Sequence, residues 1–295
     1  MPFFTKSRND GIYVRGEAAH GMIMPHIMCT RTESVVYFPL ELCAESTMDY
    51  IDRQRAKGVR ITLFNIVLAA LARTAHEYPK INRFITGRRL YLHNNFEVAY
   101  VIKRRMSLEG EEAPIKIAFS PSENLFASSQ KMNERRSEVK HGSVEDTDKI
   151  IALLACLPRF MMRAVVSGAK CLDYFGMLPR SFTDDLPFYS SVFISHVGSI
   201  GADAPYHHLF EMGTCSIFIT LGKVYDKLVL TDDGTVRNAK YVNLRATIDE
   251  RICEGYYLAR ALDRFKELIA NPALLEVAYS EKDKTPTPLV RQTAL

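Results

Sequence analysis

The chain has 295 residues, of which 47% are hydrophobic and 24% are charged, and its formal net charge is +4. This length and composition are typical of a globular protein with one large core, near the upper size for a single domain. The small and dispersed positive charge argues against nucleic acid as a partner.

The first 21 residues are polar and contain glycines, so they do not resemble a secretion signal. The six cysteines include no CxxC pair and lie mostly in apolar runs. We therefore expect buried free thiols and a reducing, cytoplasmic location. The HxxxH, HExxH and CxxC spacings of metal sites do not occur in the sequence, and we expect no metal.

The beginning of the chain contains few periodic patterns. We expect residues 1–28 to form an irregular leading segment. The β-branched and aromatic run 34–40 predicts a strand, and the polar run 44–57 predicts a helix that stops at Gly58.

The next part of the chain has stronger patterns. Thr62 begins a long run that is apolar on most sides, which predicts a buried helix that Pro79 ends. Residues 81–104 predict two or three strands joined by turns at 87–89 and 93–95. A further strand is expected at 115–120, and the charged run 124–141 predicts a helix on the solvated surface.

An apolar stretch follows within residues 147–187. Its most apolar part, 150–166, is interrupted by Pro158, Arg159 and Arg163, so it lacks the ~20-residue apolar run of a membrane-spanning helix. Three interpretations remain open: a helix buried against the domain or a neighbouring subunit, a lid over an apolar substrate tunnel, or peripheral membrane contact through an Arg-flanked helix.

The last part of the chain joins a strand to a helix through charged residues. Residues 242–248 alternate between apolar and polar, which predicts a strand. The charged group 249–251 follows it, and a 3.6-residue apolar pattern after Gly255 predicts a helix that ends at Asn271-Pro272. Charged side chains at such a turn are held on a rigid frame, as functional residues often are.

This segment resembles the active-site motif of the chloramphenicol acetyltransferase-like superfamily, in particular of the catalytic domains of 2-oxo acid dehydrogenase dihydrolipoamide acyltransferases. Those domains carry D-H-R-x-x-D-G on a strand and then a helix that ends in E-N-P-x-x-L. This chain has DERICEG at 249–255 and ANPALL at 270–275. Glu250 stands at the position of the family's catalytic histidine, and Glu254 stands at that of its aspartate.

Three further segments resemble the family in the same order along the chain. They are GVRITLFNIVLAALARTAHEYPKIN at 58–82, SVFISHVGSIGAD at 191–203 and SIFITLGKVYDKLVL at 216–230. The likeness therefore covers about residues 34–275.

The resemblance implies an α/β fold of two layers, a mixed sheet covered by helices, in a single acyltransferase-like domain over residues 1–280. Residues 147–187 would be an apolar helical insertion, and 281–295 a polar tail. It also implies a homotrimer with active sites at the subunit interfaces, and CoA or acyl-CoA as co-substrate. The family's lipoyl and subunit-binding domains are not in this chain, so we expect a stand-alone enzyme rather than the core of a dehydrogenase complex.

The resemblance also implies site residues. In the family a histidine takes the proton of the nucleophile, and a serine hydroxyl from a neighbouring subunit helps to hold the oxyanion. Ser195 matches that serine, although a serine that caps a strand end is the alternative.

The base is less clear from the sequence. Moving a proton from a thiol to a glutamate is uphill by about 6 kcal/mol at unperturbed pKa values, against about 3 kcal/mol for a histidine. A base at Glu250 therefore needs a dry site, and Glu254, if close, would raise one pKa of the pair. A structural salt bridge between Glu250 and Arg251 is the alternative.

Histidines offer other candidates for the base. His207 and His208 begin HHLFEMG, which is similar to the superfamily's HHxxxDG signature but lacks its aspartate and precedes a different strand. His196 lies beside Ser195. A neutral imidazole suits acyl transfer, although each of these could be an ordinary, partly buried histidine.

Two functions are consistent with these features. The first is a stand-alone CoA-dependent acyltransferase that moves an acyl group from acyl-CoA to a small acceptor. The second, suggested by Glu250 at the histidine position, is a catalytically inactive relative that serves as an assembly or ligand-binding protein. Membrane or lipid association through residues 150–166 is compatible with either.

Overall fold

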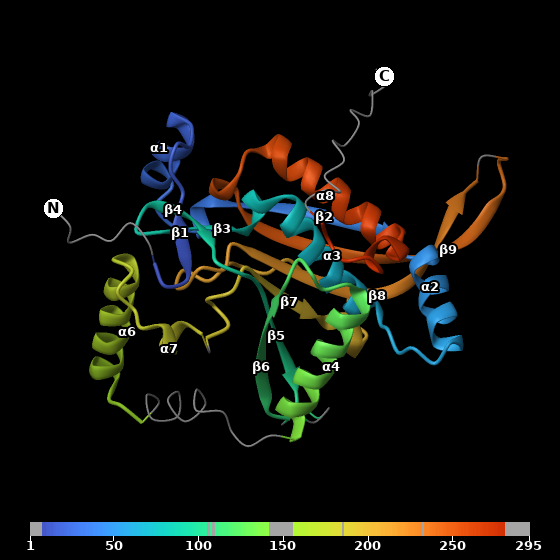
Figure 1. Cartoon of the computed structure of the whole chain (residues 1–295), viewed down its shortest axis with the longest axis horizontal. Helices are drawn as coiled ribbons and strands as arrows, with labels where there is room; N and C mark the ends of the chain where they lie inside the picture. The colour runs from blue at the N-terminus through green and yellow to red at the C-terminus, as the bar shows by residue number, and fades with distance from the viewer. Residues whose placement is uncertain are drawn as a thin grey trace.

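A computed structural model describes residues 8–104, 107, 110–141, 156–184, 186–231 and 233–280 of the chain. Its centre is a six-stranded sheet made of β2 (Val35–Cys43), β5 (Phe96–Lys103), β6 (Glu112–Phe119), β7 (Val192–His196), β8 (Ile217–Leu230) and β9 (Val236–Asp249). The strand order is β2-β9-β8-β7-β5-β6 (Figure 1). The sheet is mixed because β7 runs parallel to both of its neighbours, whereas the other neighbouring strands are antiparallel.

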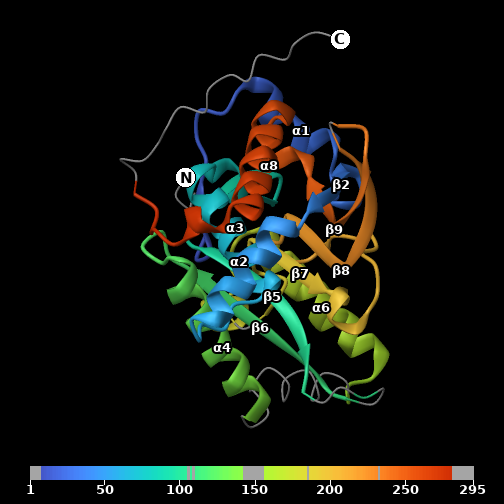
Figure 2. The same ribbon diagram turned by 90° about the vertical axis from the view of Figure 1, so that its right-hand side faces the viewer.

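Helices cover one face of this sheet, which we call the helix-covered face (Figure 2). They are α2 (Glu45–Ala56), α3 (Leu63–Glu77), α4 (Leu125–His141) and α8 (Gly255–Ala270). Helix α3 is central, and its Ile66, Val67 and Leu68 are fully buried against the strands. These helices confirm the predicted two-layer α/β architecture, including the buried helix.

The ends of α3 have clear local causes. The Thr62 side chain accepts a hydrogen bond from the Asn65 backbone, and the Asn65 side chain accepts one from the Thr62 backbone, which makes a capping box. After the helix, Pro79 begins a short 3-10 turn, because proline lacks the N–H that a helix interior requires. In the same way α8 ends at Ala270, before Pro272.

The other side of the sheet, which we call the loop-covered face, is covered by the irregular segment 201–216. Leu209, Phe210 and Cys215 from this segment pack on Phe193 of β7 and Phe218 of β8. This second apolar cluster is much smaller than the one under the helices.

A second, three-stranded sheet has the order β1 (Gly11–Tyr13), β4 (Arg89–His93) and β3 (Arg83–Thr86). Residues 81–104 contain β3 and β4 of this sheet and β5 of the larger one, which confirms the predicted strands as three. The expectation that 1–28 is irregular is wrong, because β1 pairs with β4 and α1 (Ala19–Ile27) follows it. The pairing joins residues about eighty positions apart, and a local pattern does not reveal it.

The shorter elements complete the description. They are the helices α6 (Arg159–Tyr174) and α7 (Arg180–Thr183), and the 3-10 turns η1 (Thr32–Ser34), η2 (Pro79–Asn82), η3 (Val197–Ile200), η4 (Glu250–Ile252) and η5 (Pro272–Leu275). Among the described residues, no helix combines the length and apolarity that a membrane span requires.

The apolar stretch does not behave as a helix buried against the domain. In α6 only Asp173 is buried, and nearly all of its apolar side chains are exposed in the single chain. The part of the predicted insertion at 147–155 and the predicted tail at 281–295 lie outside the described residues.

The expectation of six buried cysteines is wrong for four of them. Cys29, Cys43, Cys156 and Cys171 are exposed, and Cys215 and Cys253 are buried; all are free thiols. Cys29 and Cys43 are exposed because they lie at the ends of α1 and β2, where an apolar neighbourhood in the sequence does not ensure burial. Burial raises the pKa of the Cys253 thiol to about 12.

Candidate active site

Ser195 lies near the end of β7, in a row of polar side chains across three strands. It is in register with Thr220 of β8, which is in register with Arg245 of β9. Side chains alternate between the faces of a strand, and Ile194 belongs to the core under the helices. Ser195 therefore points to the loop-covered face. It is partly buried, and its hydroxyl makes no hydrogen bond with another described residue.

The turn between β9 and α8 contains a buried ion pair, and its members differ from those expected. The Arg251 guanidinium donates to the Asp249 carboxylate at 2.8 and 2.6 Å, with both side chains almost fully buried. It also donates to the Met28 carbonyl oxygen at 2.7 Å. The predicted Glu250–Arg251 salt bridge is therefore wrong.

Glu250 is exposed, as the first residue of η4, and it forms no hydrogen bond or ion pair within the described part of the chain. Asp249 is the last residue of β9, where both faces of the strand are covered, and its carboxylate takes the arginine. Glu250 is the first residue of the 3-10 turn that follows, so its side chain no longer follows the strand and is exposed. Its carboxylate is accessible to a molecule outside this chain.

Glu254 precedes the first residue of α8 and already has a partner. Its carboxylate accepts two hydrogen bonds from Lys80, at 2.9 and 3.0 Å, and its side chain is 57% exposed. The hydrogen bond from Lys80 lowers the pKa of Glu254 below its usual value. A lowered pKa makes Glu254 a weaker base.

Ser195 and Glu250 lie toward opposite ends of the strands that carry them. Ser195 is level with Arg245, and Glu250 follows five positions later along the chain. At the usual rise of a strand this is about 17 Å along the sheet, and crossing two strands adds about 10 Å. One chain therefore does not bring these two predicted residues together.

His207 lies on the same face as Ser195. Its ring stacks on Phe218, with 3.9 Å between the ring centroids and 8° between the planes. Phe218 is the cross-strand neighbour of Phe193, which is two residues before Ser195. Diagonal neighbours of this kind are about 7–8 Å apart on a sheet. Among the predicted bases, His207 is thus placed near Ser195 within one chain.

The hydrogen bonds of the two adjacent histidines define their tautomers. Nδ1 of His207 lies 2.9 Å from the His208 carbonyl oxygen, and Nδ1 of His208 lies 3.0 Å from the Leu209 carbonyl oxygen. A carbonyl oxygen only accepts, so in each ring Nδ1 carries the proton. Nε2 of each neutral ring is then the basic atom.

His196 follows Ser195 in the chain but lies on the other face. Its ring stacks on Phe64 of α3, with 5.2 Å between the centroids. Burial lowers the pKa of His196 below its ordinary value. The strand alternation therefore separates it from Ser195, and it is a core histidine rather than a partner of that serine.

A buried arginine that the sequence did not reveal holds the histidine segment in place. The Arg31 guanidinium donates to the backbone carbonyl oxygens of Phe210, Ile85 and Gly213, at 2.8, 3.1 and 2.5 Å. Burial lowers the pKa of Arg31, and the nearby Asp249 carboxylate partly offsets this effect. No local pattern marks Arg31, because its partners are backbone atoms from distant segments.

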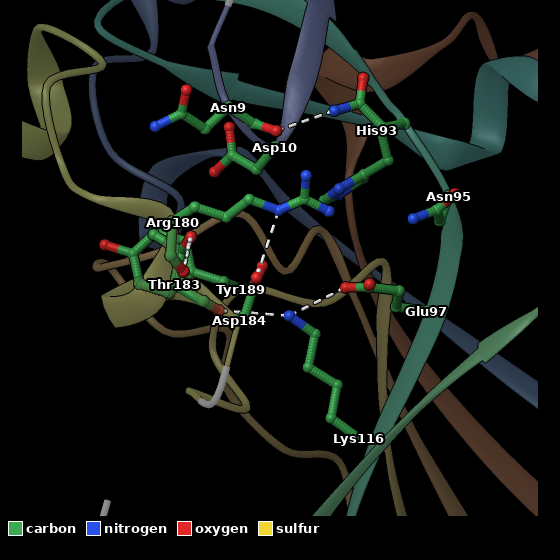
Figure 3. Close-up of a pocket in the computed structure, with 11 residues that line it drawn as sticks. Asn9, Asp10, His93, Asn95, Glu97, Lys116, Arg180, Thr183, Asp184 and Tyr189 are labelled. Atoms are coloured by element: carbon green, nitrogen blue, oxygen red, sulfur yellow. Dashed lines mark hydrogen bonds and ion pairs between the residues drawn. The ribbon is translucent and has the colours of Figure 1, made fainter.

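A polar cleft lies elsewhere, between the start of β5 and α7 (Figure 3). It encloses an empty volume of about 350 Å³ that opens to solvent, and none of the predicted site residues lines it. Its charged side chains already have partners: Lys116 pairs with Glu97 at 2.8 Å, and Arg180 pairs with Asp184 at 3.2 Å. We interpret it as the contact between the domain and residues 180–184 and 189.

Comparisons with known proteins agree with this architecture. Residues 189–277 match the family described as 2-oxoacid dehydrogenases acyltransferase (catalytic domain). The dihydrolipoamide acetyltransferase of Azotobacter vinelandii is similar in structure, with a TM-score of 0.55 and 15% identity over 89% of this chain and 94% of that one.

Two further structures have the same fold. The cubic core of a pyruvate dehydrogenase multienzyme complex has a TM-score of 0.50 and 15% identity, over 89% of this chain and 94% of that one. A chloramphenicol acetyltransferase has a TM-score of 0.51 and 12% identity, over 88% and 99%. A comparison with curated protein sequences finds no significant match.

The chain has the fold of the chloramphenicol acetyltransferase-like proteins.

Within this superfamily fold, the matched region 189–277 contains both Ser195 and the turn with Glu250. It also contains His207 and His208. Among the described residues, no group of three His, Cys, Asp or Glu side chains is arranged to hold a metal ion. The arrangement offers a free hydroxyl and an imidazole on one face, and a free carboxylate at the far end of the sheet.

Proposed function

We propose that the protein is an acyltransferase that moves an acyl group from acyl-CoA to a small acceptor, at sites formed between copies of the chain. The observation that supports this most is the position of Ser195 and Glu250 toward opposite ends of one sheet, both within the region that matches the acyltransferase family. A surface that presents one residue at each end suits a head-to-tail ring. A homotrimer and a cytoplasmic location are part of the proposal.

The chemistry requires a base, a hydroxyl donor and no covalent intermediate on the protein. The base takes the proton of the acceptor's hydroxyl or thiol, and the acceptor atom attacks the thioester carbonyl carbon. The Ser195 hydroxyl donates a hydrogen bond to the oxyanion that forms. The C–S bond then breaks, and the CoA thiolate takes the proton from the base, which leaves the acylated acceptor and free CoA.

Two residues are placed to act as this base. His207 presents its ring on the face of Ser195 in the same chain, and Nε2 is the ring nitrogen left to accept a proton when Nδ1 donates to the His208 carbonyl oxygen. Glu250 presents an unpaired, exposed carboxylate that reaches Ser195 only from a second copy. Glu254 is less suitable because Lys80 holds its carboxylate.

Activity is measured by the release of free thiol from a series of acyl-CoAs, with small alcohols, amines and thiols as acceptors. We expect Ser195→Ala to lower kcat about 100-fold or more, the loss that removal of one oxyanion donor produces. His207→Gln and Glu250→Gln are compared in parallel, and the larger loss identifies the base. Glu138→Gln, an exposed carboxylate on α4, is the matched control and keeps full activity.

A mixed assembly tests whether the site lies between copies. Ser195→Ala and Glu250→Gln chains are refolded together and compared with each variant alone. If Glu250 serves the neighbour's Ser195, a mixed ring contains at least one intact site and regains part of the activity. If both variants stay inactive when mixed, a site between copies that uses these two residues is rejected.

The second candidate is a catalytically inactive relative that binds a ligand or supports an assembly. Glu250 at the position of the family's histidine is the observation that favours it. It predicts that CoA raises the melting temperature of the protein while no pair of acyl-CoA and acceptor gives turnover above buffer. That result would overturn the acyltransferase proposal.

A further inference from the structure

Helix α6 lies at one side of the molecule, away from the helices that cover the sheet (Figure 1, Figure 2). It is attached at its carboxyl end, where the Arg8 guanidinium donates to the Asp173 carboxylate at 2.7 Å and to the Asp173 carbonyl oxygen at 2.6 Å. Along the rest of the helix the domain only partly covers Met162 and Ala169. Most of its surface is therefore free in the single chain.

An apolar stripe runs along the exposed side of α6. It follows the i, i+4 spacing of one helix face and consists of Phe160, Met161, Ala164, Val165, Gly168 and Leu172. Phe160 is 73% exposed, and Met161, Val165 and Leu172 are each more than 40% exposed. This stripe faces away from the residues that the domain covers, so folding of the chain alone does not bury it.

The side of the helix next to this stripe is positively charged. Arg159, Arg163 and Lys170 are spaced four and seven residues apart, which places them on one flank, and all three are exposed. None of them forms an ion pair within the described part of the chain. The one acidic residue of the helix, Asp173, is buried with Arg8. The exposed surface of α6 therefore carries cations and no anions.

We propose that α6 is a membrane-surface helix, which lies in the headgroup region of an anionic bilayer. The apolar stripe would enter the boundary of the acyl chains, and the three cations would contact lipid phosphates. Helices that lie in this plane combine an apolar face with a flank rich in Lys and Arg.

Binding to vesicles tests the proposal with the full chain. In co-sedimentation we expect the protein to bind vesicles of phosphatidylcholine and phosphatidylglycerol, and to bind pure phosphatidylcholine weakly. Each basic residue near an anionic surface contributes about a five-fold gain in affinity, so neutralising three predicts a loss of about 100-fold. The test variant is Arg159→Gln/Arg163→Gln/Lys170→Gln.

The matched control removes the same charge from another exposed surface, as Arg53→Gln/Lys57→Gln/Arg60→Gln on and after α2. It should keep the affinity within about three-fold, since these cations are not next to an apolar stripe. An equal loss in both triple variants would mean that net charge alone attracts the protein, which overturns the assignment to α6. Absence of wild-type binding to anionic vesicles would also overturn it.

A fluorescent reporter tests insertion directly, because the chain contains no tryptophan. Phe160→Trp should show a blue-shifted emission on addition of anionic vesicles, and Tyr256→Trp, which replaces an exposed ring at the start of α8, should not. The competing explanation, an interface between copies, is tested with the variant Phe160→Ser/Val165→Ser, whose oligomeric state is measured by light scattering. If these changes alter the oligomeric state and leave vesicle binding intact, the stripe is an interface between copies.

Discussion

The two faces of the six-stranded sheet are stabilised in different ways. The helix-covered face is a continuous apolar core between the strands and the helices α2, α3, α4 and α8. The loop-covered face has a small apolar cluster, and next to it lie buried charges: Arg31, Asp249 and Arg251. Ser195 and His207 lie on this second face, whereas His196 lies on the first.

The two faces differ in how much of the stability depends on a single side chain. On the helix-covered face many contacts share the stabilisation, and each side chain replaces water with neighbours of similar shape. On the loop-covered face one guanidinium holds three backbone carbonyl oxygens from two segments, and one carboxylate neutralises another buried cation. Removing one partner there leaves an uncompensated buried charge. We therefore expect single substitutions to act most strongly on the loop-covered face.

The largest expected effect is that of Asp249→Ala. It leaves the Arg251 guanidinium buried without its carboxylate, and we expect the free energy of unfolding to fall by about 3–5 kcal/mol. Urea denaturation followed by circular dichroism measures it. The neighbouring Glu250→Gln is the control, since an exposed and unpaired side chain should change stability by less than about 0.5 kcal/mol.

The double variant Asp249→Asn/Arg251→Met sharpens this test. If the single variant is unstable because a buried charge is left alone, removing both charges should recover part of the loss. A double variant as unstable as Asp249→Ala would indicate instead that the hydrogen bonds to the turn, rather than charge compensation, hold this part of the face.

The second effect is a dependence of stability on pH through His93. This ring lies where the small sheet meets segment 201–216, with Nε2 3.3 Å from the Thr214 carbonyl oxygen. Burial lowers the pKa of His93 to about 4, against about 6.5 in an unfolded chain. Between these values the unfolded chain binds more protons, so stability is present above pH 6.5 and is lost as the pH falls toward 4.

The expected loss reaches about 3 kcal/mol between pH 7 and pH 4. It is measured as the urea midpoint across this range, and His93→Gln should remove this part of the slope. His20→Gln, which changes an exposed histidine, should leave the slope as in the wild type. A wild-type slope that survives in His93→Gln would assign the pH dependence to other groups.

The sequence predicted the helix-covered face better than the loop-covered face, for the same physical reason. The spacing of Leu258, Ala261, Phe265 and Leu268 follows from the helix itself, and Pro79 and Pro272 stop helices wherever they occur. Arg31, in contrast, binds carbonyl oxygens 54, 179 and 182 positions away in the chain. Its partners are backbone atoms, which leave no pattern of side chains to recognise.

The sequence predicted residues of the candidate site, but not how they are arranged in space. Ser195 and Glu250 were found because short motifs place them on a strand and at a strand-to-helix turn. Their separation along the sheet depends on the register of β7, β8 and β9, which a motif does not contain. The pairing of Asp249 with Arg251 was missed because it depends on where β9 ends: Asp249 is its last, buried residue, and Glu250 begins an exposed 3-10 turn.

The third effect belongs to the helix-covered face, at the start of α3. Thr62→Ala removes the side-chain oxygen that accepts from the Asn65 backbone, and loss of such a cap lowers stability by about 1 kcal/mol. Thr62→Ser keeps the hydroxyl and serves as the control. If both variants lose the same amount, the methyl group rather than the cap is responsible, and the start of the helix is held by packing.

The smallest effect is expected for the ion pair between Lys80 and Glu254, in the same turn as Asp249 and Arg251. Its members are 30% and 57% exposed, so water already screens them, and we expect a coupling energy below about 1 kcal/mol. A double-mutant cycle with Lys80→Met and Glu254→Gln measures it, and high salt should remove it. Because the two ion pairs lie a few residues apart, the contrast between them isolates burial as the cause of the difference.

A coupling above about 2 kcal/mol that resists salt would mean that Lys80 and Glu254 are shielded from water in solution. Contact with a second copy at this turn would produce such shielding, and it would place Glu250 at that interface as well.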